Sequence, residues 1–228
     1  MGVARGKVFQ DSRTWFAIVC VLLRRTLNSL FGSRPLERRA ARVVCLGLDG
    51  AGKTSFCSCL EGRPVLAEEP TPGFNCRNAP LGDAWMLELW DLGGAAAIRP
   101  YWRRYVTEDT ALVVFVVDAA DASRVGEARE ALGAIASAAG PGRPFLVVAN
   151  KQDEALAADS TELAEALDLE ARLAGSSWAV LPFSCAHEVG AASRREDGAG
   201  ESAGAAPPEK SPELATICGW LEGALGNR

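Results

Sequence analysis

The stretch Gly47-Leu48-Asp49-Gly50-Ala51-Gly52-Lys53-Thr54 decides the fold of this 228-residue chain. Its spacing is G-x-x-x-x-G-K-[ST], in which glycines let several backbone N–H groups surround a polyphosphate. An apolar run at 41–46 precedes it and a helix-like segment at 53–60 follows, so the helix would present its N-terminus to the anion. We predict that Lys53 reaches the β- and γ-phosphates and that the Thr54 hydroxyl binds Mg²⁺. The alternative is a glycine-rich turn without a ligand.

The composition indicates a soluble globular protein with an uneven distribution of charge. Apolar residues make up 48% and charged residues 23% of the chain, which is ordinary for one domain with extensions. Residues 1–42 hold nine Lys/Arg against two acids, a net +7, whereas the remainder holds 15 against 27, a net −12. The basic arm predicts an anionic partner such as a membrane surface, and the acidic body argues against general nucleic-acid binding.

The seven cysteines do not form a recognisable metal-binding pattern in the sequence. There is no C-x-x-C pair, Cys57-x-Cys59 is too closely spaced for a usual zinc half-site, and His187 is the single histidine. We therefore interpret the cysteines as buried or surface thiols in a reducing compartment.

The N-terminal arm carries features of a membrane-surface segment. Gly2 follows Met1 as in myristoylated proteins, although Gly6 stands where the motif has Ser or Thr. The apolar run 15–23 is too short to span a bilayer, and no signal-peptide cleavage pattern follows it. Helical spacing continues to Phe31 between basic residues, which predicts an amphipathic helix at a membrane interface. A helix packed on the body is the alternative, and Cys20 is either a palmitoylation site or a buried thiol.

The rest of the chain alternates strand and helix patterns. Predicted strands are 41–46, one starting at Phe74, 85–91, 111–117, 145–149 and 178–183. Predicted helices are 53–60, 123–139, 161–173 and a final one capped by Ser211, with its apolar face formed by Leu214, Ile217, Leu221 and Leu225. This order predicts an α/β fold with a six-stranded, mostly parallel sheet covered by helices on both faces.

Two domain-level features complete this prediction. Residues 1–40 form the basic arm and 41–228 the folded domain, with a disordered Ala/Gly/Pro-rich insertion at about 188–212. Because ligands bind at the carboxyl ends of parallel strands, Gly47, Asp91 and Asn150 should converge on one edge of the sheet.

These motifs resemble those of small GTPases of the Ras superfamily, and among them the ADP-ribosylation factor-like (Arf-like) family. The resemblance covers the chain from about the N-terminal helix, whose end is marked by Leu30-Phe31-Gly32, to the final helix; the insertion and the long N-terminal arm fall outside it. It is carried by the loop 47–54 and by Pro70-Thr71-Pro72-Gly73-Phe74-Asn75, Trp90-Asp91-Leu92-Gly93-Gly94, Ile98-Arg99-Pro100-Tyr101-Trp102, Phe115-Val116-Val117-Asp118, Ala149-Asn150-Lys151-Gln152-Asp153 and Ser184-Cys185-Ala186.

The resemblance implies a GTP/GDP site with bound Mg²⁺. Thr54 and Thr71 would bind the metal directly and Asp91 through water, with Thr71 engaged only when a γ-phosphate is present. Asn150 and Asp153 would read guanine, Lys151 would cover the base, and the backbone at Cys185-Ala186 would complete its pocket. The full set of implied nucleotide contacts is Gly47, Asp49, Gly50, Ala51, Gly52, Lys53, Thr54, Ser55, Thr71, Gly94, Asn150, Lys151, Asp153, Cys185 and Ala186. A polar turn after a strand is the alternative reading of 150–153.

Two residues depart from the family pattern. Ala95 stands where the family usually has the glutamine that orients the attacking water, so we expect very slow GTP hydrolysis. Pro72 removes one backbone N–H from the switch loop and biases Thr71 toward extended conformations.

These features predict a monomeric, cytoplasmic, peripherally membrane-associated switch that binds effector proteins through its switch regions. A constitutive GTP-binding scaffold without turnover is the alternative. A P-loop kinase or ATPase is a third possibility, but it would have no use for Asn150 and Asp153.

Overall fold

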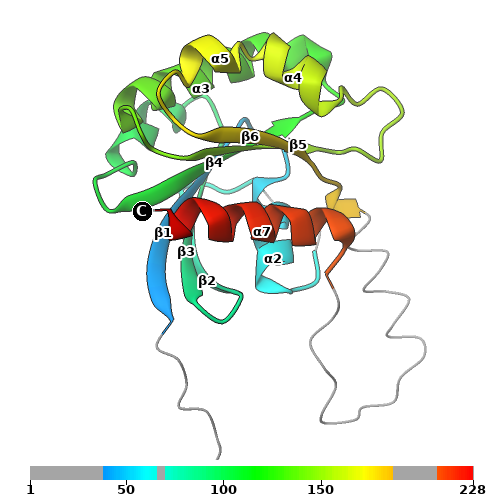
Figure 1. Cartoon of the computed structure of the whole chain (residues 1–228). Coiled ribbons are helices and arrows are strands. Elements are labelled where there is room, and N and C mark those ends of the chain that lie inside the picture. Colours follow the sequence, from blue (N-terminus) through cyan, green and yellow to red (C-terminus); the bar gives the residue numbers. More distant parts are fainter. Residues whose placement is uncertain (1–37, 66–69, 187–209, 228) are drawn as a thin grey trace, which may run out of the picture. The chain divides into compact units, whose positions relative to one another are not determined.

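The computed structural model describes residues 38–65, 70–186 and 210–227, which contain a six-stranded sheet between two layers of helices (Figure 1). The sheet order is β2-β3-β1-β4-β5-β6. Only the β2–β3 pair is antiparallel, and the other neighbours run parallel. The strands are β1 (Arg39–Leu46), β2 (Phe74–Leu81), β3 (Trp85–Leu92), β4 (Thr110–Asp118), β5 (Phe145–Asn150) and β6 (Trp178–Pro182). The predicted fold class is confirmed.

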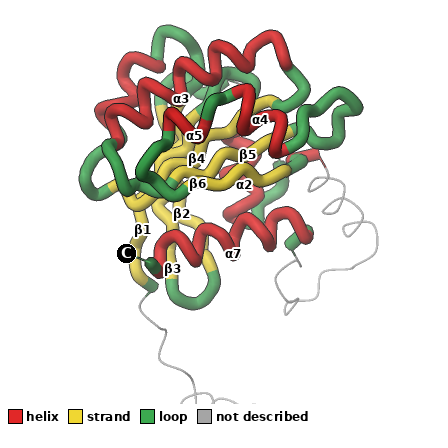
Figure 2. Tube along the Cα trace, turned by 45° about the horizontal axis from the view of Figure 1, so that its top comes forward, coloured by secondary structure: helices red, strands yellow, loops and turns green. Residues whose placement is uncertain are grey.

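The central strands are buried on both faces because helices cover each side of the sheet. All six residues of β5 are buried, as are the first eight of β4, which explains their continuous apolar sequences. On one face the core joins α2 (Lys53–Glu61) and α7 (Pro212–Gly226) to the sheet. On the other it joins α3 (Val125–Ala139), α4 (Ser160–Ala166) and α5 (Leu169–Arg172) to it. Figure 2 shows these two groups of helices on opposite sides of the strands.

The last helix forms as its sequence predicts. The Ser211 hydroxyl accepts the N–H of Leu214 at 3.1 Å and so caps the first turn of α7. All four residues of the predicted apolar face are buried against the sheet. The predicted N-terminal amphipathic helix and the sites at Gly2 and Cys20 lie outside the described residues. Most of the predicted insertion does too, and α7 begins at Pro212.

One predicted helix is wrong as a single element. The segment 161–173 is split into α4 and α5 at Asp168, whose backbone is left-handed with φ 55°. Leu167 and Leu169 are both fully buried. In a continuous helix, two residues two positions apart would point about 200° away from each other. The break lets both leucines face the core. The predicted helix 123–139 likewise begins as a short 3₁₀ turn, η2 (Ala122–Arg124).

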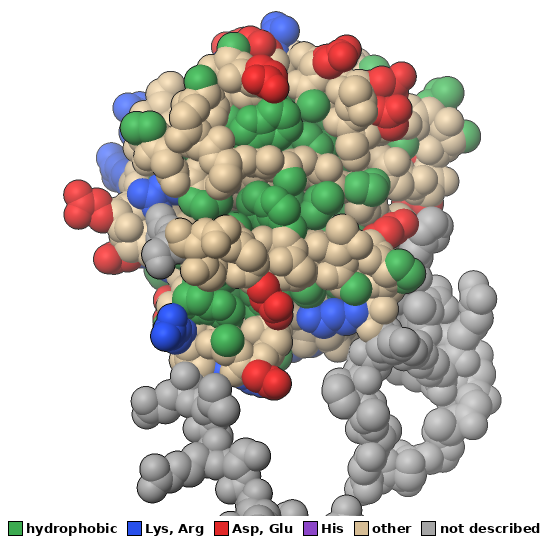
Figure 3. All heavy atoms as spheres, in the orientation of Figure 1, with side chains coloured by type: hydrophobic (Ala, Val, Ile, Leu, Met, Phe, Trp, Pro, Cys, Tyr) green, Lys and Arg blue, Asp and Glu red, His purple; other side chains and the backbone are tan. Residues whose placement is uncertain are grey.

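The strand β6 lies at one edge of the sheet, as Pro182 predicts. Its residues 178–181 are half-buried, and Figure 3 shows apolar side chains gathered in the middle of the face along which β6 runs. Among the described residues, no helix is both long enough and apolar enough to cross a membrane.

Candidate functional site

The phosphate-type loop connects β1 to α2, and glycines allow its backbone to pass close to its neighbours. Gly47 has φ +143°, and a Cβ there would lie 2.1 Å from the carbonyl oxygen of Val116. Gly52 has φ +90°, and a Cβ there would lie 2.2 Å from the side-chain nitrogen of Asn150. Any side chain at either position would collide with the wall of the loop, which explains the glycines of the motif.

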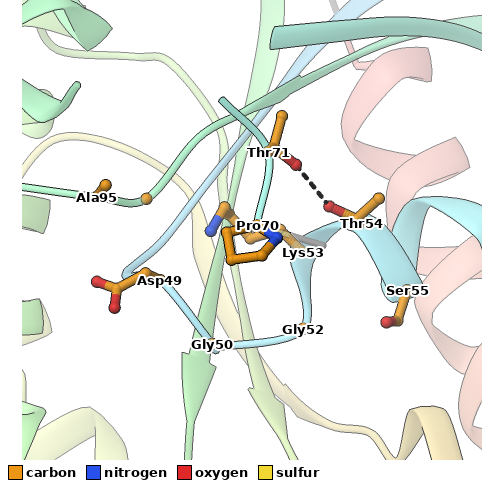
Figure 4. Close-up of a pocket in the computed structure, with 10 residues that line it drawn as sticks. Asp49, Gly50, Gly52, Lys53, Thr54, Ser55, Pro70, Thr71 and Ala95 are labelled. Atoms are coloured by element: carbon orange, nitrogen blue, oxygen red, sulfur yellow. Dashed lines mark hydrogen bonds between the residues drawn. The ribbon is translucent and has the colours of Figure 1, made fainter. Parts of the chain in front are cut away.

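Lys53 and Thr54 are the first two residues of α2, and both line the pocket beside the phosphate loop (Figure 4). The Lys53 ammonium is buried and donates to the carbonyl oxygen of Leu48 at 2.8 Å, so it lies across the loop. Burial lowers the pKa of Lys53, and the nearby acidic groups, Asp91 among them, oppose this shift. An anion bound in the loop would relieve the cost of burying this charge.

Three oxygen donors converge beside Lys53. The Thr54 hydroxyl donates to Oδ2 of Asp91 at 2.8 Å and lies 3.1 Å from the Thr71 hydroxyl, a contact drawn as the dashed line in Figure 4. Adjacent oxygen ligands of an octahedral Mg²⁺ are about 2.9 Å apart. The 3.1 Å between the two hydroxyls therefore fits two adjacent Mg²⁺ ligands, and Asp91 lies where it would hold the metal through water.

The turn after β3 links the phosphate loop to the switch loop. The N–H of Gly93 donates to the carbonyl oxygen of Gly73 at 2.8 Å, and its carbonyl accepts the indole N–H of the buried Trp102 at 2.9 Å. A Cβ on Gly94 would lie 2.4 Å from the backbone N of Asp49. The Gly93–Gly94 turn is thus packed directly against the phosphate loop, where its backbone can respond to a bound phosphate.

Together these elements enclose a pocket of about 240 Å³. Its wall is formed by Asp49, Gly50, Gly52, Lys53, Thr54, Ser55, Pro70, Thr71, Gly94 and Ala95. Among these ten described residues none carries a carboxamide. Figure 4 shows the side chain of Ala95 on the far side of the pocket from Ser55. Ala95 therefore contributes only a methyl group to the pocket wall.

The Asp49 carboxylate on this wall is held by two arginines. Arg99 donates to its Oδ1 at 3.0 Å and Arg124 at 2.8 Å. The hydrogen bond from Arg124 is the main cause that lowers the pKa of Asp49. Glu127 of α3 pairs with both arginines. This network ties α3 and η1 (Arg99–Arg104) to the phosphate loop.

The residues predicted to recognise the guanine base form a second group next to the phosphate loop. The Asn150 amide donates to the carbonyl oxygen of Ala51 at 2.8 Å, and its oxygen accepts the N–H of Cys185 at 3.4 Å. Asn150 thus joins the phosphate loop to the Ser184–Ala186 turn. The Asp153 carboxylate is exposed and accepts the buried Ser184 hydroxyl at 2.5 Å, which fixes its direction.

Lys151 is held in a strained conformation beside these residues. Its backbone has φ 66°, which is uncommon for a residue other than glycine. Its ammonium pairs with Oδ2 of Asp118 at 2.5 Å. This ion pair fixes the direction of the aliphatic part of the Lys151 side chain. That apolar part can then lie over the guanine base, as the resemblance implies.

The structure therefore brings the predicted residues together in two adjoining groups. The phosphate and metal residues line the pocket, and the base residues surround the turn at the end of β5. Reasoning from the sequence missed three supporting residues, Arg99, Arg124 and Ser184. The detectable signal for Ser184 was its place in the stretch Ser184-Cys185-Ala186, next to the predicted Cys185. The arginines could not be assigned because their shared partner, Asp49, is 50 and 75 positions away in the sequence.

Comparisons with known proteins agree with this geometry. A family model described as "ADP-ribosylation factor family" matches residues 25–196. The chain belongs to the ADP-ribosylation factor family. It is 38% identical over 161 residues to ADP-ribosylation factor 3 of Arabidopsis thaliana, covering 70% of this chain and 84% of the relative. It is 41% identical over 146 residues to ADP-ribosylation factor-like protein 3 of Chlamydomonas reinhardtii, covering 63% and 80%.

A solved structure of this family has the same fold. The Arl6 BBS3 small GTPase from Trypanosoma brucei, determined with the bound nucleotide analogue GppNp, aligns with a TM-score of 0.59 and 28% identity. The alignment covers 67% of this chain and 91% of that one. Family and fold together make this Arf-family chain a GTP-binding switch protein that interacts with effectors.

Proposed function

We propose that this Arf-family chain hydrolyses GTP much more slowly than family members that have the glutamine. It would therefore keep GTP bound for much longer. The observation that carries the proposal is the methyl group of Ala95 on the wall of the phosphate pocket. An alanine side chain cannot accept a hydrogen bond from water, so it cannot orient the attacking nucleophile. Lys53 and Thr54 are unaffected, so nucleotide binding is retained while catalysis is weakened.

Among the ten residues that line the pocket, Asp49 carries the one carboxylate, and it is a poor substitute for the glutamine. Its Oδ1 already accepts hydrogen bonds from Arg99 and Arg124. Arg124 also lowers its pKa, which weakens it as a proton acceptor. A water at this end of the pocket would therefore lack an efficient base within the chain.

Bound Mg²⁺ would neutralise phosphate charge, and the residues of this chain would place it. Thr54 and Thr71 offer hydroxyl oxygens, while Asp91 accepts the Thr54 hydrogen bond and would hold the metal through water. Thr71 belongs to the loop that leads into β2, so its engagement would order that loop.

The first test measures single-turnover hydrolysis of γ-labelled GTP with Mg²⁺ by the full chain. We expect a rate close to that of free GTP, and we expect Ala95→Gln to accelerate it at least about tenfold. Ala97→Gln is the matched control, because Ala97 is also exposed but does not line the pocket. Equal rates for the wild type and Ala95→Gln would refute the role given to this position.

The second test identifies the nucleotide that copurifies with the chain by its mass. Because hydrolysis is slow, we expect most of the copurifying nucleotide to be GTP.

Competition against labelled GDP then tests the choice of base. We expect GTP to displace the label and ATP to fail to do so. If ATP competed as well as GTP, the roles given to Asn150 and Asp153 would be wrong. GTP retention that no cell extract can reverse would favour a constitutive scaffold.

An exposed aromatic cluster is the proposed effector surface. Phe74 is 48% exposed, stacks on Trp90 at 5.5 Å between ring centroids, and contacts Tyr105 at 5.4 Å. The guanidinium of Arg42 lies 4.2 Å from the centre of the Trp90 ring. Phe74 follows Gly73, which is hydrogen-bonded to Gly93, so a change at the phosphate pocket would be transmitted to the aromatic rings.

The emission of Trp90 tests this coupling. We expect intrinsic tryptophan fluorescence to change when GDP is exchanged for a non-hydrolysable GTP analogue, and Trp90→Phe to lose most of that change. Trp178→Phe, at the opposite edge of the sheet, is the control. A fluorescence change that persists in Trp90→Phe would show that the aromatic cluster does not respond to the bound nucleotide.

The basic arm at residues 1–40 supports a further part of the proposal, association with a membrane surface. Its positive charge and apolar run favour an anionic bilayer. The test is flotation of the full chain with liposomes that contain anionic lipid, compared with a chain lacking residues 1–31. Equal flotation of the two forms would contradict the proposed association with a membrane through the arm.

A further inference from the structure

A compact group of two thiols and one carboxylate lies beneath the phosphate loop. Cys45 comes from β1, Cys57 from α2 and Asp91 from β3. Their sulfur and carboxylate oxygen atoms all lie within 4.8 Å of one another. The three residues are 1%, 0% and 0% exposed, so the group is sealed from solvent. We call it the thiol cluster.

The fold brings these residues together from distant parts of the sequence. Cys45 and Asp91 are direct neighbours in the parallel register of β1 and β3, so their side chains leave the sheet on the same side. Cys57 lies four residues after Lys53 on α2, one turn further along the same helix face. Because α2 packs on this side of the sheet, its thiol lies close to the other two groups.

The donor set matches a thiophilic divalent cation better than it matches Mg²⁺. Zinc is commonly bound by cysteine thiolates with histidine or carboxylate ligands, and three protein ligands leave a fourth position open. Mg²⁺ takes oxygen ligands and seldom thiolates. The thiol cluster therefore differs in chemistry from the group of Thr54 and Thr71 directly above it, although Asp91 belongs to both.

The charge balance of the cluster suits a divalent cation, because a metal binds thiols as thiolates and so compensates the charge of its own ligands. Two thiolates and one carboxylate would be neutralised by the cation together with the Lys53 ammonium, which interacts with Cys45 and Asp91. Arg77 is the other positive group that acts on Cys57.

We propose that Cys45, Cys57 and Asp91 form a binding site for a thiophilic divalent cation such as Zn²⁺. The bound cation draws the Asp91 carboxylate away from Thr54, to which it is now joined by a 2.8 Å hydrogen bond. Occupation of the thiol cluster thereby weakens the support for Mg²⁺ and nucleotide in the pocket above. The cation site stands independently of the proposed function, whereas this competition rests on it.

Cobalt is the probe for the site itself. The full chain is reduced with a phosphine, stripped of metal and incubated with Co²⁺ during nucleotide exchange at low Mg²⁺, because a buried site fills only when the loop opens. We expect a sulfur-to-cobalt charge-transfer absorption band, which Co²⁺ bound only by the oxygen ligands of the Mg²⁺ site would not give. Cys45→Ser and Cys57→Ser should each lose at least half of the band. Cys59→Ser is the matched control, since Cys59 is buried on the same helix outside the cluster.

The cobalt result decides the site whatever the nucleotide does. A wild-type chain without the band, or Cys45→Ser and Cys57→Ser variants with an unchanged band, would overturn the proposal. Circular dichroism of each variant shows whether a lost band reflects a lost fold. The wild-type spectrum remains decisive if a variant fails to fold.

Release of a fluorescent GDP analogue tests the competition. One equivalent of Zn²⁺ should accelerate release from the wild type and from Cys59→Ser by about tenfold or more, and should leave Cys57→Ser unchanged. A cobalt band without any effect of Zn²⁺ on release would keep the site and refute the competition. A chain that binds no guanine nucleotide would instead refute the proposed function, and the cobalt spectrum would still report on the thiol cluster.

Discussion

Replacement of Asn150 by alanine provides the sharpest test of how the two halves of the nucleotide site are joined. The side chain is 2% exposed and bridges two loops. Its amide donates to the carbonyl oxygen of Ala51 in the phosphate loop, and its oxygen accepts the N–H of Cys185 in the base turn. Asn150→Ala removes both contacts and leaves the carbonyl of Ala51 without this donor.

The expected cost follows from the two distances. The bond to Ala51 is short, at 2.8 Å, and buried, so losing it costs about 1–3 kcal/mol. The bond from Cys185 is long, at 3.4 Å, and adds about 0.5 kcal/mol. Because both loops must be held in place when nucleotide is bound, most of this cost should appear as weaker binding. We expect nucleotide affinity to fall by roughly tenfold to several hundredfold.

Dissociation of a fluorescent GDP analogue from the full chain measures this loss. Asn150→Asp should be impaired as well, because a carboxylate keeps the acceptor for Cys185 but cannot donate to Ala51. Asn78→Ala, at an exposed position on the edge strand β2, should behave as the wild type. Thermal unfolding in excess nucleotide separates a binding defect from a folding defect. Unchanged release from Asn150→Ala would refute the idea that this side chain couples the two loops.

Three further predictions concern the walls of the site. Gly47→Ala should lower the free energy of unfolding by at least about 2 kcal/mol in urea titrations, because its Cβ would lie 2.1 Å from the oxygen of Val116; an unchanged midpoint would contradict this. Ser184→Ala should reduce the preference for GTP over ATP in competition binding, since it removes a hydrogen bond that orients the Asp153 carboxylate, and an unaltered preference would remove Ser184 from the site. The Asp49 pKa is lowered from 3.8 on folding, so its stabilising effect is present at neutral pH and is lost as the pH falls below about 4. Asp49→Asn should therefore flatten the acid end of the stability–pH curve, and an identical curve would show that the arginine network does not stabilise the fold.

Local patterns predicted most of the secondary structure, because a strand that is buried on both faces of the sheet has an uninterrupted run of apolar residues. The runs 111–117 and 145–149 are apolar throughout, and they lie within β4 and β5. The cap at Ser211 depends on neighbouring residues and was also predicted. The break at Asp168 was missed because alanine, leucine and glutamate suit a helix everywhere in 161–173, whereas the burial of Leu167 and Leu169 is decided by the core.

The phosphate loop could be located from the sequence alone because its mechanism depends on backbone N–H groups and on residues that follow one another. The same holds for Asn150 and Asp153, which come directly after a buried strand, and for Ala95, whose side chain visibly lacks the chemistry of the family's glutamine. Family and fold class thus follow from the order of residues.

Only the tertiary structure brought distant side chains into contact. It placed Arg99 and Arg124 on Asp49, made Asn150 a bridge between loops, and aligned Cys45 with Asp91 through the pairing of β1 and β3. The sequence argued against a zinc site because its cysteines lack the usual spacing, yet the fold gathers two thiols and a carboxylate within 4.8 Å. Ligand spacing along the chain predicts a site when the ligands come in closely spaced pairs. Strand register and helix packing alone determine whether side chains from three separate elements meet.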